Sequence, residues 1–173
     1  PAKKPVIESA EITPENKLII TFDVVTNQNG TLADRAAVDA VIDWGGKSLG
    51  AAYSGEWSVV GDKSVLTIEI TDATGRTLEA GDTISIKPAA NVKDENNTSE
   101  PSDATATVSG SWVVAVTGVT LAPSDVTLKV NETATLTATV QPANATNKNV
   151  TWSSDDEAVA SVGNGVVTAT AAG

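Results

Sequence analysis

Apolar and polar residues alternate with a period of two along much of the chain. The alternation is clear in residues 17–25 (KLIITFDVV), 64–70 (SVLTIEI), 82–88 (DTISIKP) and 103–108 (DATATV). Turn-forming Gly, Pro, Asn and Asp residues separate these runs. The runs themselves are rich in Val, Ile and Thr, which fit a pleated, half-buried surface. The pattern therefore predicts β-strands in these four stretches.

One stretch, residues 32–46, follows a helical period instead. Its apolar residues recur at a spacing of four, so that they would form one stripe along a helix: Leu32, Ala36, Ala40 and Trp44. Thr31 is the candidate N-cap, and Gly45 and Gly46 would end the helix. We predict a single short helix at about 32–44 that crosses one end of a β-sandwich.

The composition of the chain changes at about Val113, where charged residues become scarce and Thr becomes frequent. Short runs with strand character follow at regular spacing: 118–121, 126–130, 134–140, 149–152, 158–162 and 165–170. This spacing is typical of an all-β sandwich. Since no Pro- or Gly-rich linker precedes Val113, we predict an all-β chain of two abutting β-sandwich domains, residues 1–112 and 113–173.

The chain contains no Cys, Met or His, and its 22 acidic residues outnumber its 11 basic residues to give a formal net charge of −11. The missing residue types exclude thiol chemistry, thiolate or imidazole metal sites, and catalytic triads with an imidazole base. The negative charge would repel phosphate backbones, so nucleic acid is not expected as a partner.

No apolar run approaches the roughly 18 residues that a membrane-spanning helix needs, so membrane insertion is not expected. The N-terminal residues 1–9 (PAKKPVIES) contain neither a starting Met nor the apolar core of a signal peptide. We therefore interpret the sequence as a piece of a longer or processed protein.

A series of motifs runs through the second predicted domain: VTLAP (119–123), NET (131–133), LTATVQP (136–142), VTWSS (150–154) and GNGVVTATAAG (163–173). In this order they resemble the bacterial immunoglobulin-like domains of group 2. Asn131 stands where that family has a turn glycine, and Asn tolerates the left-handed backbone that the turn needs. The resemblance implies an Ig-like sandwich and no catalytic residues.

In that family the closing Ala-x-Gly of residues 171–173 is normally followed by one more strand. The resemblance therefore implies that the second domain is C-terminally truncated and lacks its last strand. We expect an open edge beside residues 165–170, which could recruit a strand from a neighbouring chain.

The first predicted domain carries a different set of motifs: ITFD (20–23), the helix-like insert, residues 81–102 and ATATVSGSW (104–112). They are similar to Ig-like repeats of bacterial surface-layer (S-layer) and cell-wall proteins. Such modules occur in long secreted proteins that form rods or two-dimensional lattices. The resemblance again implies a stiff module without catalytic residues.

The four tryptophans are the candidate aromatic sites. Trp152 alternates with Val150 and is expected to fill the core between two sheets. Trp44 ends the helical stripe and is expected in the core or against the helix. Trp57 is either a core residue or an exposed platform for a flat ligand such as a sugar. Trp112, at the predicted domain boundary, is an interface candidate that would pack across the join.

The loop 91–100 (NVKDENNTSE) gathers oxygen-bearing side chains, the ligands that Ca2+ prefers. Its spacing is not that of a helix–loop–helix calcium site, and a solvated polar loop is the alternative. The candidate calcium ligands are Asp94, Glu95, Asn96 and Glu100, with Asn91, Asn97, Asp23 and Asp43 as further oxygen donors.

The acidic run 155–157 (DDE) follows two serines and precedes an apolar run, so we interpret it as a solvated turn and not as a pair of catalytic carboxylates. No enzymatic activity is predicted. No cofactor is expected apart from the candidate Ca2+.

Together these patterns predict a structural module of a secreted bacterial protein at the cell surface or cell wall, a surface-layer lattice component that acts as a rigid spacer and contact unit. Its partners would be neighbouring copies or other domains of the same surface protein, with cell-wall polysaccharide as a further candidate. The alternative is an adhesin segment or a carbohydrate-binding accessory module of a secreted enzyme, which would need an exposed aromatic platform or a polar cleft.

Overall fold

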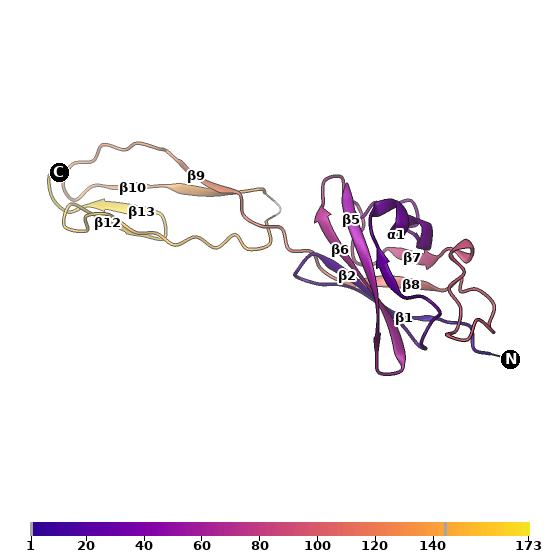
Figure 1. Cartoon of the computed structure of the whole chain (residues 1–173). Coiled ribbons are helices and arrows are strands. Elements are labelled where there is room, and N and C mark those ends of the chain that lie inside the picture. The colour runs from indigo at the N-terminus through magenta and orange to yellow at the C-terminus, as the bar shows by residue number, and fades with distance from the viewer. Residues whose placement is uncertain (1, 144) are drawn as a thin grey trace. The chain divides into compact units, whose positions relative to one another are not determined.

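The structure is a computed structural model that describes residues 2–143 and 145–173 of the chain; Pro1 and Asn144 lie outside the described residues. The chain divides into two compact units (Figure 1). Unit 1 ends at Trp112, and unit 2 comprises Val113–Gly173.

Unit 1 is a β-structure with one α-helix and one turn of 3-10 helix. Its strands form one eight-stranded sheet in the order β3-β5-β6-β2-β1-β8-β7-β4. The elements are β1 (Ile7–Ile12), β2 (Lys17–Phe22), β3 (Gly30–Leu32), α1 (Arg35–Val41), β4 (Ile42–Asp43), β5 (Ala52–Val60), β6 (Lys63–Asp72), β7 (Thr83–Ile86), η1 (Pro88–Ala90) and β8 (Thr105–Gly110).

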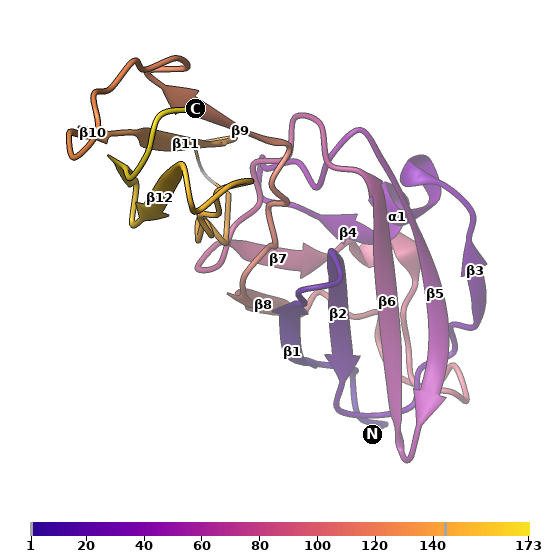
Figure 2. The ribbon, with the colours of Figure 1, turned by 90° about the vertical axis from the view of Figure 1, so that its left-hand side faces the viewer.

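This sheet curls around α1. The helix contacts β3 and β5 at one end of the strand order and β4 at the other end, which a flat sheet could not allow. Figure 2 shows the result, with α1 behind β5 and β6 and next to β4. The mostly β composition and the curled sheets are those of Ig-like β-sandwich domains, as the sequence predicted.

The core of unit 1 follows the alternation that the sequence showed. In β2 the residues Leu18, Ile20 and Phe22 are fully buried, and in β6 the residues Leu66 and Ile68 lie opposite them across the sheet. Strands were predicted at 17–25, 64–70, 82–88 and 103–108, and β2, β6, β7 and β8 confirm them. Alternation works as a signal here because each of these strands turns one face to the core.

The first and last strands of unit 1 are neighbours, and they run in parallel. This β1–β8 pair, called the seam below, has the register Ala10↔Val108, Glu11↔Ser109 and Ile12↔Gly110. All the other pairings of the described strands are antiparallel. The seam connects the half-sheet β3-β5-β6-β2-β1 to the half-sheet β8-β7-β4.

At Gly110 the backbones of β8 and β1 lie very close together. The φ angle of Gly110 is +85°, and a Cβ atom at this position would lie 2.0 Å from the carbonyl oxygen of Ile12. Any side chain would therefore overlap with the backbone of β1, so the seam needs glycine here.

The single helix was predicted correctly, but its ends were not. Asp34, not Thr31, is the N-cap, and its carboxylate accepts a hydrogen bond of 2.9 Å from the backbone N–H of Ala37. The helix ends at Val41, well before the two glycines, because Ile42 takes an extended conformation and starts β4. Thr31 lies in β3, paired with Glu56 of β5.

Unit 2 contains two small sheets. One has three strands in the order β10-β13-β12, and the other has two strands, β11 and β9. Asn131 has a φ angle of +72°, which confirms the left-handed turn expected for this residue. The elements are β9 (Gly118–Ala122), β10 (Thr133–Thr135), β11 (Thr137–Gln141), β12 (Ala160–Gly163) and β13 (Val166–Ala169).

Several strand predictions for unit 2 were wrong. Residues 126–130 and 149–152 form no strand, because they alternate in sequence but find no ladder partner. The predicted strand 134–140 is broken at Leu136, whose N–H bonds to the carbonyl of Gly165 at 2.7 Å while the residues after it pair with β9. The two halves of this run therefore belong to different sheets.

The expected open edge of the three-stranded sheet is also placed differently. A free edge was expected beside residues 165–170, but β13 is the central strand and pairs with β10 on one side and β12 on the other. The edges of this sheet are therefore β10 and β12.

Unit 2 buries little apolar surface. Ala145 and Ala169 are its buried apolar residues among those described, whereas Val119 and Leu121 of β9 are 51% and 47% exposed. Since buried apolar area is the main favourable term in folding, most of the stability of the described chain must come from unit 1.

The helices of the described residues are short. The longest, α1, has seven residues, and none of them is long and apolar enough to cross a membrane.

Candidate functional site

The loop predicted to bind calcium is held together by one of its own carboxylates. The Asp94 side chain accepts hydrogen bonds from the N–H of Thr98 at 2.7 Å, from the Thr98 hydroxyl at 2.7 Å and from the N–H of Ser99 at 2.6 Å. The hydrogen bond from the backbone N–H of Ser99, together with those from Thr98, lowers the pKa of Asp94 to about 2 and outweighs the opposing effect of burial. Asp94 therefore stabilises the conformation of its loop.

The other predicted calcium ligands have different surroundings. Glu95, Asn96 and Glu100 are exposed. The amide of Asn27 donates to the carbonyl of Asn91 at 3.1 Å and to the side-chain oxygen of Asn97 at 2.7 Å. In residues 2–143 and 145–173, no group of three or more acidic side chains lies close enough together to hold a metal ion. Calcium binding stays a prediction.

The two further carboxylates proposed as ligands also have partners within unit 1. Asp23 pairs with Lys3 at 2.7 Å and accepts from the N–H of Val6 at 2.9 Å. Asp43 accepts from the N–H of Gly45 at 3.0 Å. Asp23 therefore holds the N-terminal residues against the end of β2, and Asp43 orders the turn after β4.

The lowered pKa of Asp94 predicts a pH dependence of stability. The folded value of about 2 lies below the ordinary 3.8, so the ionised form stabilises the fold above pH 3.8, and this contribution is lost as the pH falls towards 2. We expect Asp94→Asn to lower the urea midpoint at neutral pH and to flatten the loss of stability between about pH 4 and pH 2. The exposed neighbour Glu95→Gln is the control. A variant with the wild-type slope would contradict the assignment.

Trp57 and Trp112 are buried in unit 1, each with 6% of its surface exposed. Trp57 packs on Phe22, with 5.5 Å between the ring centroids, so it does not form the exposed platform that was one of the two alternatives. The indole N–H of Trp112 donates to the carbonyl of Leu78 at 2.8 Å, and the guanidinium of Arg76 lies 4.2 Å from its ring centroid. Trp112 thus anchors the chain after β8 in the core of unit 1.

The other two tryptophans differ in burial. Trp44 is 8% exposed and packs edge-on against Tyr53, which confirms its predicted core position next to the helix. Trp152 is only half-buried. It lines a cavity together with Leu121 of β9 and Val167 of β13, which belong to different sheets of unit 2, but the predicted core position is reached only in part because the ring is not fully buried.

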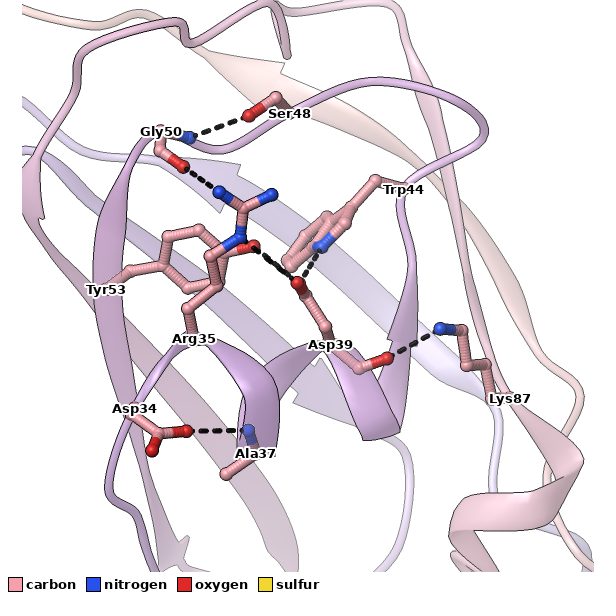
Figure 3. A network of polar contacts seen from close by, with 9 residues as sticks. All are labelled: Asp34, Arg35, Ala37, Asp39, Trp44, Ser48, Gly50, Tyr53 and Lys87. Carbon is pink, nitrogen blue, oxygen red and sulfur yellow. Dashed lines mark hydrogen bonds and ion pairs between the residues drawn. The ribbon is translucent and has the colours of Figure 1, made fainter.

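A cluster of polar contacts on α1 was not predicted from the sequence (Figure 3). One carboxylate oxygen of Asp39 accepts hydrogen bonds from the indole N–H of Trp44 at 2.6 Å and from the Tyr53 hydroxyl at 2.5 Å. The other oxygen pairs with Arg35 at 3.3 Å. The Lys87 ammonium donates to the main-chain carbonyl of Asp39 at 2.6 Å. These five residues are called the Asp39 cluster below.

The Asp39 cluster connects the helix with three other elements, β4, β5 and η1. Arg35 and Asp39 lie on α1, Trp44 follows β4, Tyr53 lies on β5 and Lys87 precedes η1. The Arg35 guanidinium also lies 5.8 Å from the centroid of the Tyr53 ring. The cluster therefore fixes the helix to both ends of the curled sheet.

In the Asp39 cluster, the pKa values of Asp39 and Tyr53 both lie further from neutral pH than usual. Burial, followed by the hydrogen bond to the Asp39 carboxylate, raises the pKa of Tyr53 to about 12. Burial alone would raise the pKa of Asp39, but the hydrogen bonds from Trp44, Tyr53 and Arg35 outweigh it and lower this pKa. A general acid or base works best with a pKa near the operating pH. These groups are therefore suited to a structural role and not to proton transfer.

Two further open cavities among the described residues are larger than the one lined by Leu121 and Val167. One, of about 520 Å³, is a groove in unit 2 lined by Val119, Leu121, Ala138, Asn149, Val150, Thr151, Trp152 and Ser153. The other, of about 420 Å³, lies in unit 1 beside Arg35 and Tyr53. The lining of the first combines apolar side chains with amide and hydroxyl groups in similar measure, and no titratable side chain is among its lining residues. The groove could hold an apolar or sugar-like group but could not supply an acid or a base.

Known proteins from several organisms are similar to part of this chain. The chain is 64% identical over 50 residues to an Ig-like virion protein of Serratia phage KSP90, which covers 29% of this chain and 19% of that protein. It is 53% identical over 57 residues to an uncharacterized protein of Clostridium acetobutylicum, which covers 32% of this chain and 6% of that protein. It is 48% identical over 61 residues to an alpha-L-arabinofuranosidase of Bifidobacterium longum, which covers 35% of this chain and 6% of that protein.

The chain thus matches less than a fifth of the length of each of these curated relatives. The family comparison defines the matching region more closely. Residues 115–173 match the family model described as Bacterial Ig-like domain (group 2), as the motifs of this region predicted. The family match therefore falls within unit 2 and covers about a third of the chain.

Proposed function

We propose that the chain is a non-catalytic structural segment of a larger, surface-exposed protein, in which its two units act as spacers and as contact sites for other domains. The observation that carries this proposal is that the clustered carboxylates of unit 1 are engaged in hydrogen bonds within the unit. In the Asp39 cluster and in the Asp94 loop, the carboxylates accept hydrogen bonds from within unit 1 and stabilise its fold. The family match supports the proposal, since Ig-like domains are generally non-catalytic modules.

The location of this segment, outside the cell or on a particle surface, is also a proposal. A relative named as a virion protein and a match to a bacterial Ig-like family favour exposure outside the cell or on a particle surface. A lattice subunit of a bacterial surface layer is one narrower form of the proposal, with neighbouring copies as partners. Calcium bridging between acidic faces is part of that form, because the net charge of −11 would otherwise keep copies apart.

Carbohydrate binding is the second candidate function. Two observations favour it: one relative is named an alpha-L-arabinofuranosidase, and the groove in unit 2 carries a half-buried tryptophan between amide and hydroxyl groups. An adhesin or an accessory module of a secreted enzyme would use such a groove. The buried Trp57 and Trp112 leave Trp152 as the aromatic ring that could contact a sugar in the described residues.

A glycan array and polysaccharide pull-downs with the full chain separate the two functions. The panel should include a polysaccharide with α-L-arabinofuranosyl side chains. We expect no retention by any glycan. Reproducible retention that is lost in Trp152→Ala, but kept in the exposed control Val126→Ala, would replace the structural proposal with carbohydrate binding. Circular dichroism of both variants shows whether they remain folded.

The lattice form has its own test. Light scattering of the chain with increasing Ca2+ should show assembly if calcium bridges neighbouring copies. Mg2+ at the same concentration is the control for charge screening. If scattering stays constant with both ions, the calcium-bridged lattice is rejected. The proposed spacer function is not affected by this result.

A further inference from the structure

We propose that the seam makes unit 1 a load-bearing module, which resists tension along the chain by loading its β1–β8 hydrogen bonds in shear. This inference deepens the proposed function, on which its biological meaning rests. It starts from the position of the terminal strands. Tension on the chain enters unit 1 at the beginning of β1 and leaves it after the end of β8, and these two strands are direct neighbours.

The parallel direction of the pair decides how it carries force. In a parallel pair, the beginning of one strand and the end of its neighbour lie at opposite ends of the ladder. Tension applied at these two points pulls the strands past each other along their own axes. The cross-strand bonds from Ala10↔Val108 to Ile12↔Gly110 then share the load and must fail together. Force applied at the same end of both strands would instead open the bonds one after another.

Side-chain bonds extend the seam beyond the backbone ladder. The Ser109 hydroxyl donates to the carbonyl of Ala10 at 3.2 Å, and the Ser102 hydroxyl donates to the carbonyl of Pro5 at 2.8 Å. An ion pair between Lys4 and Asp103 lies next to the second of these bonds. Contacts between the two ends of unit 1 thus begin before β1 starts and continue to its last residue.

The surroundings of the seam also favour shear resistance. Strand β1 is flanked by β2, and β8 is flanked by β7, so neither strand can leave without breaking a second ladder. The side chains of Ile12 and Val108 are buried, each with 2% of its surface exposed. Water therefore cannot reach these bonds from the core side, whereas the outer face of the seam, with Glu11 and Ser109, is exposed.

Trp112 protects the loaded end of β8. Its indole bonds to the carbonyl of Leu78, and Arg76 covers its ring, just two residues after β8 ends. Tension from the C-terminal side must first pull this ring out of the core. The anchor therefore delays the arrival of force at the seam.

Unit 2 has a different arrangement and serves as an internal reference. Its first strand, β9, lies in the two-stranded sheet, and its last strand, β13, lies in the three-stranded sheet. Among the described strands of unit 2, the first and last are therefore not paired with each other. We expect unit 2 to give way at lower force than unit 1.

Single-molecule pulling of the full chain tests this order of events. Each unit is identified by its gain in contour length, at about 3.5 Å per residue released. The shorter gain of unit 2 should come first and the longer gain of unit 1 at higher force. If unit 1 extends first or at the same force, the seam carries no special load.

A second experiment changes only the direction of force. The chain contains no Cys, so introduced cysteines define the attachment points. The exposed pair Lys3→Cys with Ser111→Cys loads the seam in shear, whereas Lys3→Cys with Glu100→Cys pulls both strands from the same end. Because rupture under force follows the unfolding rate, we expect the shear pair to need at least about twofold more force at equal loading rate. Equal forces would overturn the proposal.

Two matched serine variants test whether the resistance to force comes from the seam. Ser109→Ala removes a hydroxyl–carbonyl bond across the seam, and Ser58→Ala removes a comparable bond, at 3.5 Å, between β5 and β6. In the shear geometry, the first variant should lower the rupture force and the second should leave it unchanged. If both variants respond alike, the resistance to force does not come from the seam. Glycan retention would contradict the proposed function without changing these forces, so the two proposals can fail separately.

Discussion

Gly110→Ala is expected to destabilise unit 1 by about 3–5 kcal/mol, or to prevent its folding, because the new side chain cannot fit against β1. The φ angle of +85° is unfavourable for a residue with a Cβ atom. The larger effect is steric, since that atom would lie 2.0 Å from the carbonyl oxygen of Ile12 and 3.0 Å from its N atom. The seam would have to open for the alanine to be accommodated. Urea unfolding followed by tryptophan fluorescence measures the change.

The control for this prediction is Gly61→Ala in the β5–β6 turn. Gly61 also has a positive φ angle, +65°, but no atom lies within 4 Å of the position of its Cβ. Alanine there should lose only about 1–2 kcal/mol through backbone strain. If the two variants lose equal stability, the close approach of β1 and β8 does not hold the sheet together as described.

Asp39→Ala is expected to lower the stability of unit 1 by about 2–4 kcal/mol, because two largely buried donors lose their acceptor at once. The indole N–H of Trp44 and the hydroxyl of Tyr53 both bond to the same carboxylate oxygen, and these side chains are 8% and 3% exposed. Without Asp39 neither donor reaches water easily, so each bears the penalty of an unsatisfied polar group. Chemical denaturation of the variant and the wild type gives the difference.

A double-mutant cycle shows whether the loss comes from the cluster. Tyr53→Phe removes one donor and should lose about 1 kcal/mol by itself. In the Asp39→Ala background the same change should have little effect, or restore stability, since the unsatisfied hydroxyl is gone. Additive effects of the two substitutions would contradict the proposed coupling. Asp62→Ala, in the exposed turn after β5, is the control for loss of a carboxylate.

The strands that the sequence revealed in unit 1 are those with one regular buried face. Four others, β1, β3, β4 and β5, were missed, and for β1 and β5 the reason is local. Strand β1 has a register shift between Ile7 and Ser9, so its buried residues do not alternate along the sequence. In β5, Gly55 occupies an inward position where a Cβ atom would meet Leu66 at 3.1 Å and Leu32 at 3.4 Å. A glycine that is required by close packing looks like a turn signal when only the sequence is read.

The candidate site was harder to predict than the fold. Asp39 lies four residues after Arg35 and reads as one half of an ordinary surface ion pair on a helix. Its more important partner, Tyr53, comes from another element 14 residues away, and no spacing in the sequence indicates this contact. Conversely, the oxygen-rich loop 91–100 was recognised by composition. Composition could not show that Asp94 is already bonded to Thr98 and Ser99.

In unit 2 the motifs were more informative than the alternation. They identified the family correctly, and Asn131 adopts the expected left-handed turn. The strands predicted at 126–130 and 149–152 failed because alternation indicates a tendency to form a strand, whereas a ladder also needs a neighbour at the right distance. That neighbour depends on tertiary structure, which a local pattern does not contain.

The seam also determines when unit 1 can fold. The bond between Ser109 and Ala10 joins residues that are 99 positions apart, whereas the β5–β6 hairpin closes through a short turn. The hairpin can form as soon as it is synthesised, but β1 must wait for β8, the last strand of the unit to be made. Contacts of such long sequence separation slow folding. During synthesis from the N-terminus, unit 1 would therefore stay open along the seam until β8, its last strand, has been produced.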